Sequence, residues 1–106
     1  MSEFVKVAKV KDIASGKSKV VEFNGRPVVI FNQNGKFSAI DNVCPHKGAP
    51  LNEGVFMGSM VICPWHSWTF DIANGSCITN PRAKVSCFEI KIEGEELLLK
   101  APSSQP

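Results

Sequence analysis

Two short motifs of cysteine and histidine are the residues of this chain best suited to chemistry. One residue separates Cys44 from His46, two separate Cys63 from His66, and the sixteen residues 47–62 lie between the motifs. Thiolate sulfur and imidazole nitrogen are ligands for zinc and for iron–sulfur clusters. The pattern therefore predicts that these four side chains hold one metal centre.

Two kinds of centre fit these ligands from spacing alone. A structural zinc ion takes four such ligands and has no redox chemistry. A [2Fe–2S] cluster of the Rieske type has two histidines in place of two cysteines on one of its irons. A third interpretation is that the loops bind no metal. Both histidines and two of the four cysteines fall in this pairing, which counts against it.

The rest of the chain is a series of predicted hairpins that place both motifs in loops. β-Branched and aromatic runs alternate with turn residues at intervals of roughly ten residues, which favours an all-β domain. Hairpin turns are indicated at Asn24-Gly25, Asn34-Gly35, Asn74-Gly75 and Glu93-Gly94. Residues 11–15 fit one short helical turn. The expected strands are residues 4–10, 17–23, 27–32, 36–41, 55–62, 68–72, 76–79, 85–92 and 95–100.

Length and composition indicate one small globular domain. The chain has 106 residues, and we expect residues 1–100 to form a single domain and residues 101–106 a frayed tail. Glycine and proline gather between residues 42 and 82, which predicts a loop-rich subdomain there. The net charge of +2 is scattered, which argues against nucleic acid or an anionic membrane as a partner.

The compartment is expected to be the reducing cytoplasm. The first residues lack the features of a signal peptide, and no apolar run approaches the roughly 18 residues of a membrane span. In a reducing compartment, closely spaced cysteine and histidine favour a metal site over disulfides.

The two motifs also resemble a known family. Residues 44–51 (CPHKGAPL) followed by Gly54, and residues 63–71 (CPWHSWTFD) followed by Gly75, resemble Rieske and Rieske-type ferredoxin domains, and the hairpins extend the resemblance over nearly the whole chain. The resemblance implies an all-β fold of three antiparallel sheets with an inserted, loop-rich cluster-binding subdomain. It also implies one [2Fe–2S] cluster, with Cys44 and Cys63 on one iron and His46 and His66 on the other, more exposed iron.

Four positions depart from the high-potential members of that family. Those proteins carry a disulfide between two further loop cysteines, where this chain has Ala49 and Trp65. They also carry a serine and a tyrosine whose hydroxyls donate to the cluster sulfurs, where this chain has Trp68 and Phe70. Hydrogen bonds to sulfur stabilise the reduced cluster and raise its potential. We therefore expect a potential at the low end of the Rieske range, around −150 mV. Trp68 and Phe70 are expected to pack within the subdomain.

The expected function is one-electron transfer rather than catalysis, because no nucleophile, acid–base pair or substrate motif is visible. The resemblance implies the ferredoxin component of a multicomponent oxygenase such as an aromatic-ring dioxygenase. Its partners would be a flavoprotein reductase and a terminal oxygenase or reductase, and we expect them to dock where His46 and His66 lie. The alternative is the small subunit of an NAD(P)H nitrite reductase. An alternative of another class is a zinc-stabilised binding module. We expect a monomer.

The remaining residues of interest have simpler interpretations. Cys77 and Cys87 are expected to be small buried hydrophobic residues on strands. Trp65 is either an exposed docking element or a shield against water. Residues 80–83 (NPRA) resemble the proline-containing loop that covers the cluster in the family. Arg82 in that loop either is simply solvated or helps to dock an acidic partner.

Overall fold

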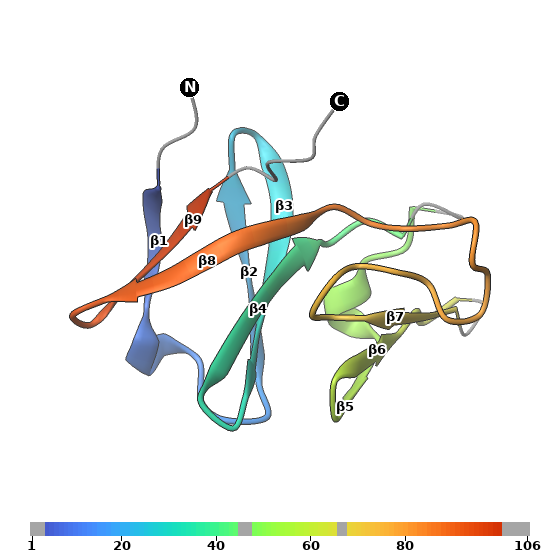
Figure 1. Ribbon diagram of the computed structural model, residues 1–106, viewed down its shortest axis with the longest axis horizontal. Coiled ribbons are helices and arrows are strands. Elements are labelled where there is room, and N and C mark those ends of the chain that lie inside the picture. Colours follow the sequence, from blue (N-terminus) through green and yellow to red (C-terminus); the bar gives the residue numbers. More distant parts are fainter. Residues whose placement is uncertain (1–3, 45–47, 66–67, 101–106) are drawn as a thin grey trace.

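The computed structural model describes residues 4–44, 48–65 and 68–100 (Figure 1). Within these ranges it holds nine strands and two 3-10 helices, which confirms the all-β class. The tail at residues 101–106 lies outside the described residues. The strands are β1 (Val5–Lys9), β2 (Ser18–Phe23), β3 (Arg26–Gln33), β4 (Lys36–Asp41), β5 (Val55–Met57), β6 (Met60–Ile62), β7 (Thr69–Asp71), β8 (Cys87–Glu93) and β9 (Glu96–Lys100), and the helices are η1 (Val10–Asp12) and η2 (Leu51–Glu53).

The strands form two antiparallel sheets. The larger has the order β1-β9-β8-β4-β3-β2, and the smaller has the order β5-β6-β7. The larger sheet consists of two halves, which meet where β4 pairs with β8 through Ala39 with Phe88 and Ile40 with Cys87. Figure 1 shows the long β8 passing in front of β2 and β3 toward the end of β4, with the small sheet beyond β4, away from β1 and β9. The two halves and the small sheet correspond to the three expected sheets.

Two of the predicted hairpin turns form at their predicted residues. Asn24 and Gly25 have φ values of 53° and 79°, and Asn34 and Gly35 have 54° and 90°. Such turns match the twist of the flanking strands, and Asn and Gly tolerate positive φ. At the last hairpin, Glu93 pairs with Glu96, so its turn lies one residue later than predicted.

Residues 55–62 were predicted as a strand interrupted by Gly58, and they form two strands instead. They form a hairpin of β5 and β6, in which Met57 pairs with Met60 around a turn at Gly58 and Ser59. Gly58 has a φ of +61° and so allows the tight reversal. The inner residues Phe56 and Val61 face the core, and Val61 pairs with Phe70 of β7.

Residues 76–79 do not form the predicted strand. Only isolated bridges occur there, between Cys77 and Phe70 and between Ser76 and Lys84. The preceding turn explains the difference, because the Gly75 N–H donates to the Asp71 carbonyl (N···O 2.7 Å) and the Asn74 side chain accepts from the Ser76 N–H (2.9 Å). This local bonding makes a longer turn than a two-residue hairpin. The predicted helical turn also begins earlier, as η1, and η2 was not predicted.

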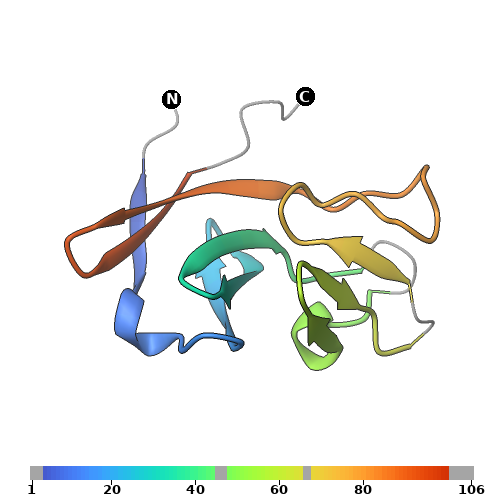
Figure 2. The same cartoon turned by 60° about the horizontal axis from the view of Figure 1, so that its bottom comes forward.

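Strand β3 separates two apolar cores and explains how the small sheet is held. Its residues Val28 and Ile30 lie in one core with Phe88, Leu97 and Leu99 of the large sheet. Its alternate residues Val29 and Phe31 lie in the second core, together with residues of the small sheet and its loops. The Phe31 and Phe56 rings are 4.6 Å apart between centroids, which ties β5 to β3. Figure 2 shows the small sheet beside β4 from a second direction.

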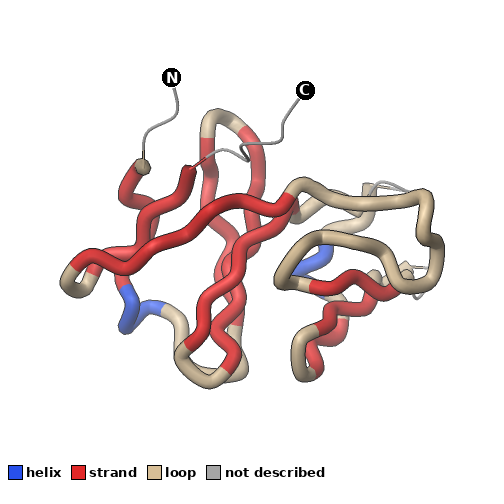
Figure 3. The backbone as a smooth tube through the Cα atoms, viewed as in Figure 1, coloured by secondary structure: helices blue, strands red, loops and turns tan. Residues whose placement is uncertain are grey.

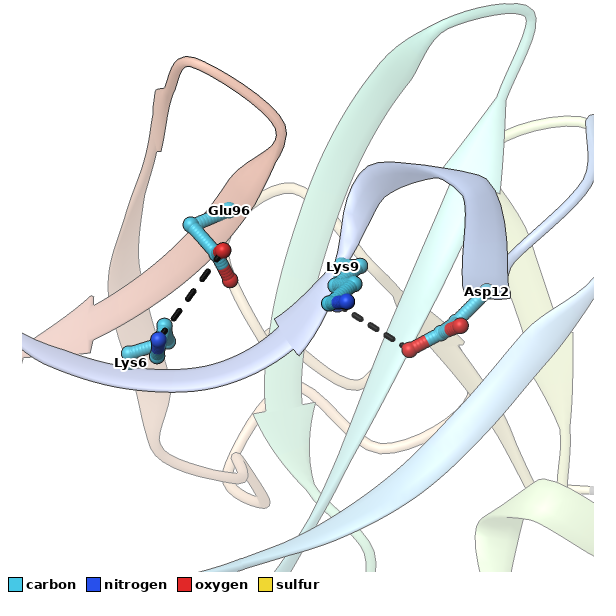
Figure 4. Close-up of polar contacts among 4 residues, drawn as sticks. All are labelled: Lys6, Lys9, Asp12 and Glu96. Atoms are coloured by element: carbon cyan, nitrogen blue, oxygen red, sulfur yellow. Dashed lines mark hydrogen bonds and ion pairs between the residues drawn. The ribbon is translucent and has the colours of Figure 1, made fainter.

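Strand β1 is fastened by polar contacts near both of its ends. The Lys9 N–H donates to Asp12 Oδ2 at 3.1 Å, and Lys6 Nζ lies 3.9 Å from Glu96 Oε2 of β9 (Figure 4). Both contacts are exposed, and exposed ion pairs contribute little free energy. The stability of the sheet therefore comes mainly from its two apolar cores. Neither helix of the described residues has the length and apolar character of a membrane span.

Candidate metal centre

The backbone N–H of a cysteine closes each of the two predicted metal-binding loops. Cys44 lies three residues after the end of β4, and Cys63 directly follows β6. The Cys44 N–H donates to the carbonyl oxygen of Ala49 (N···O 2.9 Å), and the Cys63 N–H donates to that of Trp68 (2.7 Å). In both loops the cysteine N–H thus reaches the carbonyl five residues later. Each loop is closed by its own cysteine.

The residues that flank these loops are paired in the same way. Val43 forms an antiparallel bridge with Pro50, and Ile62 pairs with Thr69, so each pair is seven positions apart in the sequence. In both loops the cysteine is the residue after the first member of the pair. The two cysteines therefore occupy equivalent positions in two equivalent loops. Figure 3 shows how much of the chain around the small sheet is loop.

Both cysteines are buried in the same apolar core. The exposed fraction is 1% for Cys44 and 2% for Cys63, and both belong to the core that contains Leu51 and Phe70. A buried thiolate costs much free energy unless a positive charge compensates it. Iron or zinc supplies that charge and prefers thiolate ligands. The chemistry of this donor pair therefore fits the predicted centre.

His46 and His66 lie outside the described residues, so their role as ligands stays a prediction. In the sequence, each histidine falls between a cysteine and the residue whose carbonyl closes that loop.

Asn42 anchors the first loop to the large sheet. Its N–H donates to the Pro27 carbonyl (N···O 3.0 Å), and its own carbonyl accepts from the Leu51 N–H (2.7 Å). Its side-chain nitrogen donates to Asn52 Oδ1 at 2.9 Å, and its side-chain oxygen accepts from the Asn52 N–H at 2.8 Å. Motif spacing did not indicate this residue. Its signal in the sequence is a polar residue at the end of a buried strand, two positions before a ligand.

Two glycines serve the loops in different ways, Gly48 by a left-handed backbone and Gly54 by a close backbone approach. Gly48 has a φ of +74°, and its N–H donates to the Cys44 carbonyl (N···O 2.7 Å). At Gly54, a Cβ atom would lie 1.8 Å from the Ile62 carbonyl oxygen. Only glycine fits there, so the chain after the first motif can touch the residue before Cys63.

The aromatic residues of the second motif divide between packing and exposure. Phe70 is fully buried, and Trp68 packs against the same core, which confirms their predicted packing role. Trp65 is 59% exposed. This exposure leaves its side chain accessible to a partner, and its role stays a prediction.

The other two cysteines differ from each other. Cys77 is 3% exposed, as predicted, but lies outside any strand, and its Sγ accepts from the Asn80 N–H at 3.3 Å. Cys87 begins β8 and is only partly buried, and its Sγ donates to the Ala73 carbonyl at 3.2 Å. Neither forms a disulfide. Burial raises the pKa of the Cys87 thiol; Lys84 lowers it and Asp71 raises it further.

The proline-containing segment at residues 80–83 is a tight turn. The Asn80 side-chain oxygen accepts from the Arg82 N–H at 3.1 Å, and its carbonyl accepts from the Ala83 N–H at 2.9 Å. The Arg82 residue is exposed to solvent.

The described residues form an antiparallel β domain with two equivalent loops, each closed at a buried cysteine. The chain belongs to the Rieske [2Fe-2S] domain family, which it matches over residues 3–92. It is 30% identical over 98 residues to the ferredoxin component of the naphthalene 1,2-dioxygenase/salicylate 5-hydroxylase systems of Ralstonia sp, covering 92% of this chain and 94% of that protein.

Two further similarities extend the comparison. The ferredoxin of carbazole 1,9a-dioxygenase from Nocardioides aromaticivorans IC177 superposes with a TM-score of 0.86 at 28% identity, covering 94% of this chain and 98% of that one. Apoptosis-inducing factor 3 of Mus musculus is 38% identical over 96 residues, which are 90% of this chain. The chain spans only 16% of the length of that protein.

These similarities confirm the predicted family, the all-β Rieske fold and the cofactor, one [2Fe–2S] cluster.

Proposed function

We propose that the chain is a one-electron carrier and acts as the ferredoxin component of a multicomponent oxygenase, such as an aromatic-ring dioxygenase. The observation that carries the proposal is the pair of equivalent loops, each closed by a buried cysteine N–H. The similarity to an oxygenase ferredoxin component over 94% of that protein's length supports the choice of system.

The proposed ligands are Cys44, His46, Cys63 and His66. When bound, a [2Fe–2S] cluster supplies the ability to take up and release one electron. The loops' own contribution is to hold the ligands still. The hydrogen bonds at Cys44 and Cys63, and the anchor at Asn42, fix both loops on the frame. A fixed ligand set limits the rearrangement that accompanies a change of charge.

The proposed partners are a flavoprotein reductase and a terminal oxygenase, and the proposed compartment is the cytoplasm. Exposed apolar side chains on and beside the two loops support a protein-docking face. Val43 is 41% exposed, Trp65 59% and Ile78 57%, and the exposed Arg82 lies in the neighbouring turn. Interfaces are enriched in such aromatic, aliphatic and arginine side chains at their centre.

A reconstituted electron-transfer assay tests the proposal. The purified chain is mixed with NADH, a flavoprotein reductase and the terminal oxygenase of a ring-hydroxylating system, and product is measured with and without the chain. We expect product to depend on the chain and to fall with a Trp65→Ala variant. Transfer to a nitrite reductase instead would favour the small-subunit alternative. A colourless, zinc-containing protein would favour the binding module.

A further inference from the structure

The segment at residues 77–83, called here the Cys77 loop, is closed by Cys77 in two ways. The Cys77 N–H donates to the Ala83 carbonyl (N···O 3.3 Å), and the Cys77 Sγ accepts from the Asn80 N–H at 3.3 Å. Cys77 is 3% exposed, so its sulfur meets this N–H away from water. The sulfur is therefore the acceptor that fixes the turn of the loop.

The Cys77 loop is joined to the second metal-binding loop through Thr69. The Ile78 N–H donates to the Thr69 carbonyl (N···O 2.7 Å), and the Thr69 N–H donates to Thr79 Oγ1 at 3.0 Å. Thr69 directly follows Trp68, whose carbonyl accepts from the Cys63 N–H (2.7 Å). A continuous set of hydrogen bonds thus runs from the Cys77 loop to Cys63.

We infer that Cys77 and Thr79 are positioning residues for the metal centre. The Cys77 sulfur holds the loop, and the loop presents the Thr79 hydroxyl to the residue that follows the closure of the Cys63 loop. This inference rests on the proposed role of Cys63 as a ligand. It gives Cys77 a specific role beyond that of a small core residue.

Conservative variants separate the hydrogen bonds from packing. Cys77→Ala removes the sulfur acceptor, whereas Cys77→Ser keeps an acceptor at the same atom position. Thr79→Val keeps the shape and removes the acceptor for the Thr69 N–H, whereas Thr79→Ser keeps that acceptor. Cys87→Ala is the matched control, because Cys87 is also hydrogen-bonded through sulfur, but to Ala73.

Three measurements on the purified full chain test the inference: the rate of loss of visible absorbance in a chelator, the electron paramagnetic resonance g-values, and deuterium exchange of peptides covering residues 63–69 and 77–83. We expect C77A and T79V to lose the cluster about three- to tenfold faster, in line with the loss of one hydrogen bond, with shifted g-values and faster exchange in both peptides. C77S, T79S and C87A should stay within about twofold of the wild type.

Unchanged cluster loss, g-values and exchange in both C77A and T79V would overturn the inference. Equal acceleration in C87A would also overturn it, because that result indicates general loosening of the fold. Thermal unfolding of each variant identifies one that fails to fold. If C77A fails, Cys77→Val, which fills the site without a hydrogen-bond acceptor, takes its place in the same three measurements. If the wild type contains no iron, the proposed function fails, whereas peptide exchange still reports whether Cys77 and Thr79 hold the second loop.

Discussion

At the residue scale, four cysteines in similar apolar surroundings have different roles. Cys44 and Cys63 close loops with their N–H groups and are buried to within 2% exposure. Cys77 uses its sulfur as an acceptor, and Cys87 uses its sulfur as a donor. What separates the two proposed ligands from the other two is the equivalent loop closure, not burial.

Replacing a proposed ligand should remove the chromophore. Cys63→Ser and His66→Ala are expected to lose the visible absorbance of the cluster, because each removes one of the four proposed protein ligands. Cys87→Ser should keep it. Absorbance spectra of the three purified variants check this expectation, and a full spectrum in H66A would refute the histidine assignment.

The hydroxyl-free positions near the cluster should set a low reduction potential. We expect a value around −150 mV, at the low end of the Rieske range. Phe70→Tyr adds a hydroxyl at the position that carries tyrosine in high-potential members, so it should raise the potential. Phe88→Tyr in the other core is the control and should leave it unchanged. A clearly positive wild-type potential in a redox titration would contradict this account.

The raised pKa of Cys87 predicts a pH dependence of stability. Burial favours the neutral thiol in the folded state, so the folded protein holds this proton to higher pH than the unfolded chain. The contribution is fully present below about pH 8.5, the ordinary pKa of cysteine, and is lost as pH rises through the folded pKa. The difference in melting temperature between wild type and C87A should shrink as pH rises above about 8.5, and a constant difference would exclude the effect.

At the scale of elements, Gly54 brings the chain after the first loop against Ile62, the residue before Cys63. Gly54→Ala would place a Cβ atom 1.8 Å from the Ile62 carbonyl oxygen. We expect a loss of stability of about 2 kcal/mol or more, typical of overpacking, and loss of the cluster. Gly94→Ala, in an open turn with a φ of +64°, should cost about 1–2 kcal/mol and keep the cluster. Urea unfolding and absorbance spectra measure both, and a G54A variant that retains the cluster would show that the loops tolerate separation.

The sequence predicted those elements whose formation depends only on neighbouring residues. Asn24-Gly25 and Asn34-Gly35 determine their turns by their own backbone preferences. The hairpin at residues 55–62 was missed because apolar residues continue on both sides of its turn, so only Gly58 marked it. The segment at residues 76–79 was predicted as a strand because hydrophobic alternation does not reveal its hydrogen bonds to Asn74 and Asp71.

The same distinction applies to the site. The two ligand motifs are local patterns, so spacing and residue type were enough to indicate them. The supporting residues were not predictable in this way, because Asn42 depends on Asn52 and Thr79 depends on Thr69, ten positions away in each case. Such contacts exist only once the chain has folded.

At the scale of the whole molecule, the proposed metal site and the strands β1 and β9 belong to different apolar cores. One core is formed by side chains of the large sheet. The other lies between β3, the small sheet and the loops. Strands β1 and β9, near the two ends of the chain, lie away from the small sheet (Figure 1). This arrangement places the small sheet at the end of the molecule away from β1 and β9, where the proposed partners would dock.

The central claim is that the chain carries one Rieske-type [2Fe–2S] cluster. The most direct test is metal analysis of the purified protein together with its visible spectrum before and after dithionite. We predict about two iron atoms per chain, a reddish-brown colour and bleaching on reduction. A colourless protein that contains zinc and does not respond to dithionite would contradict the account.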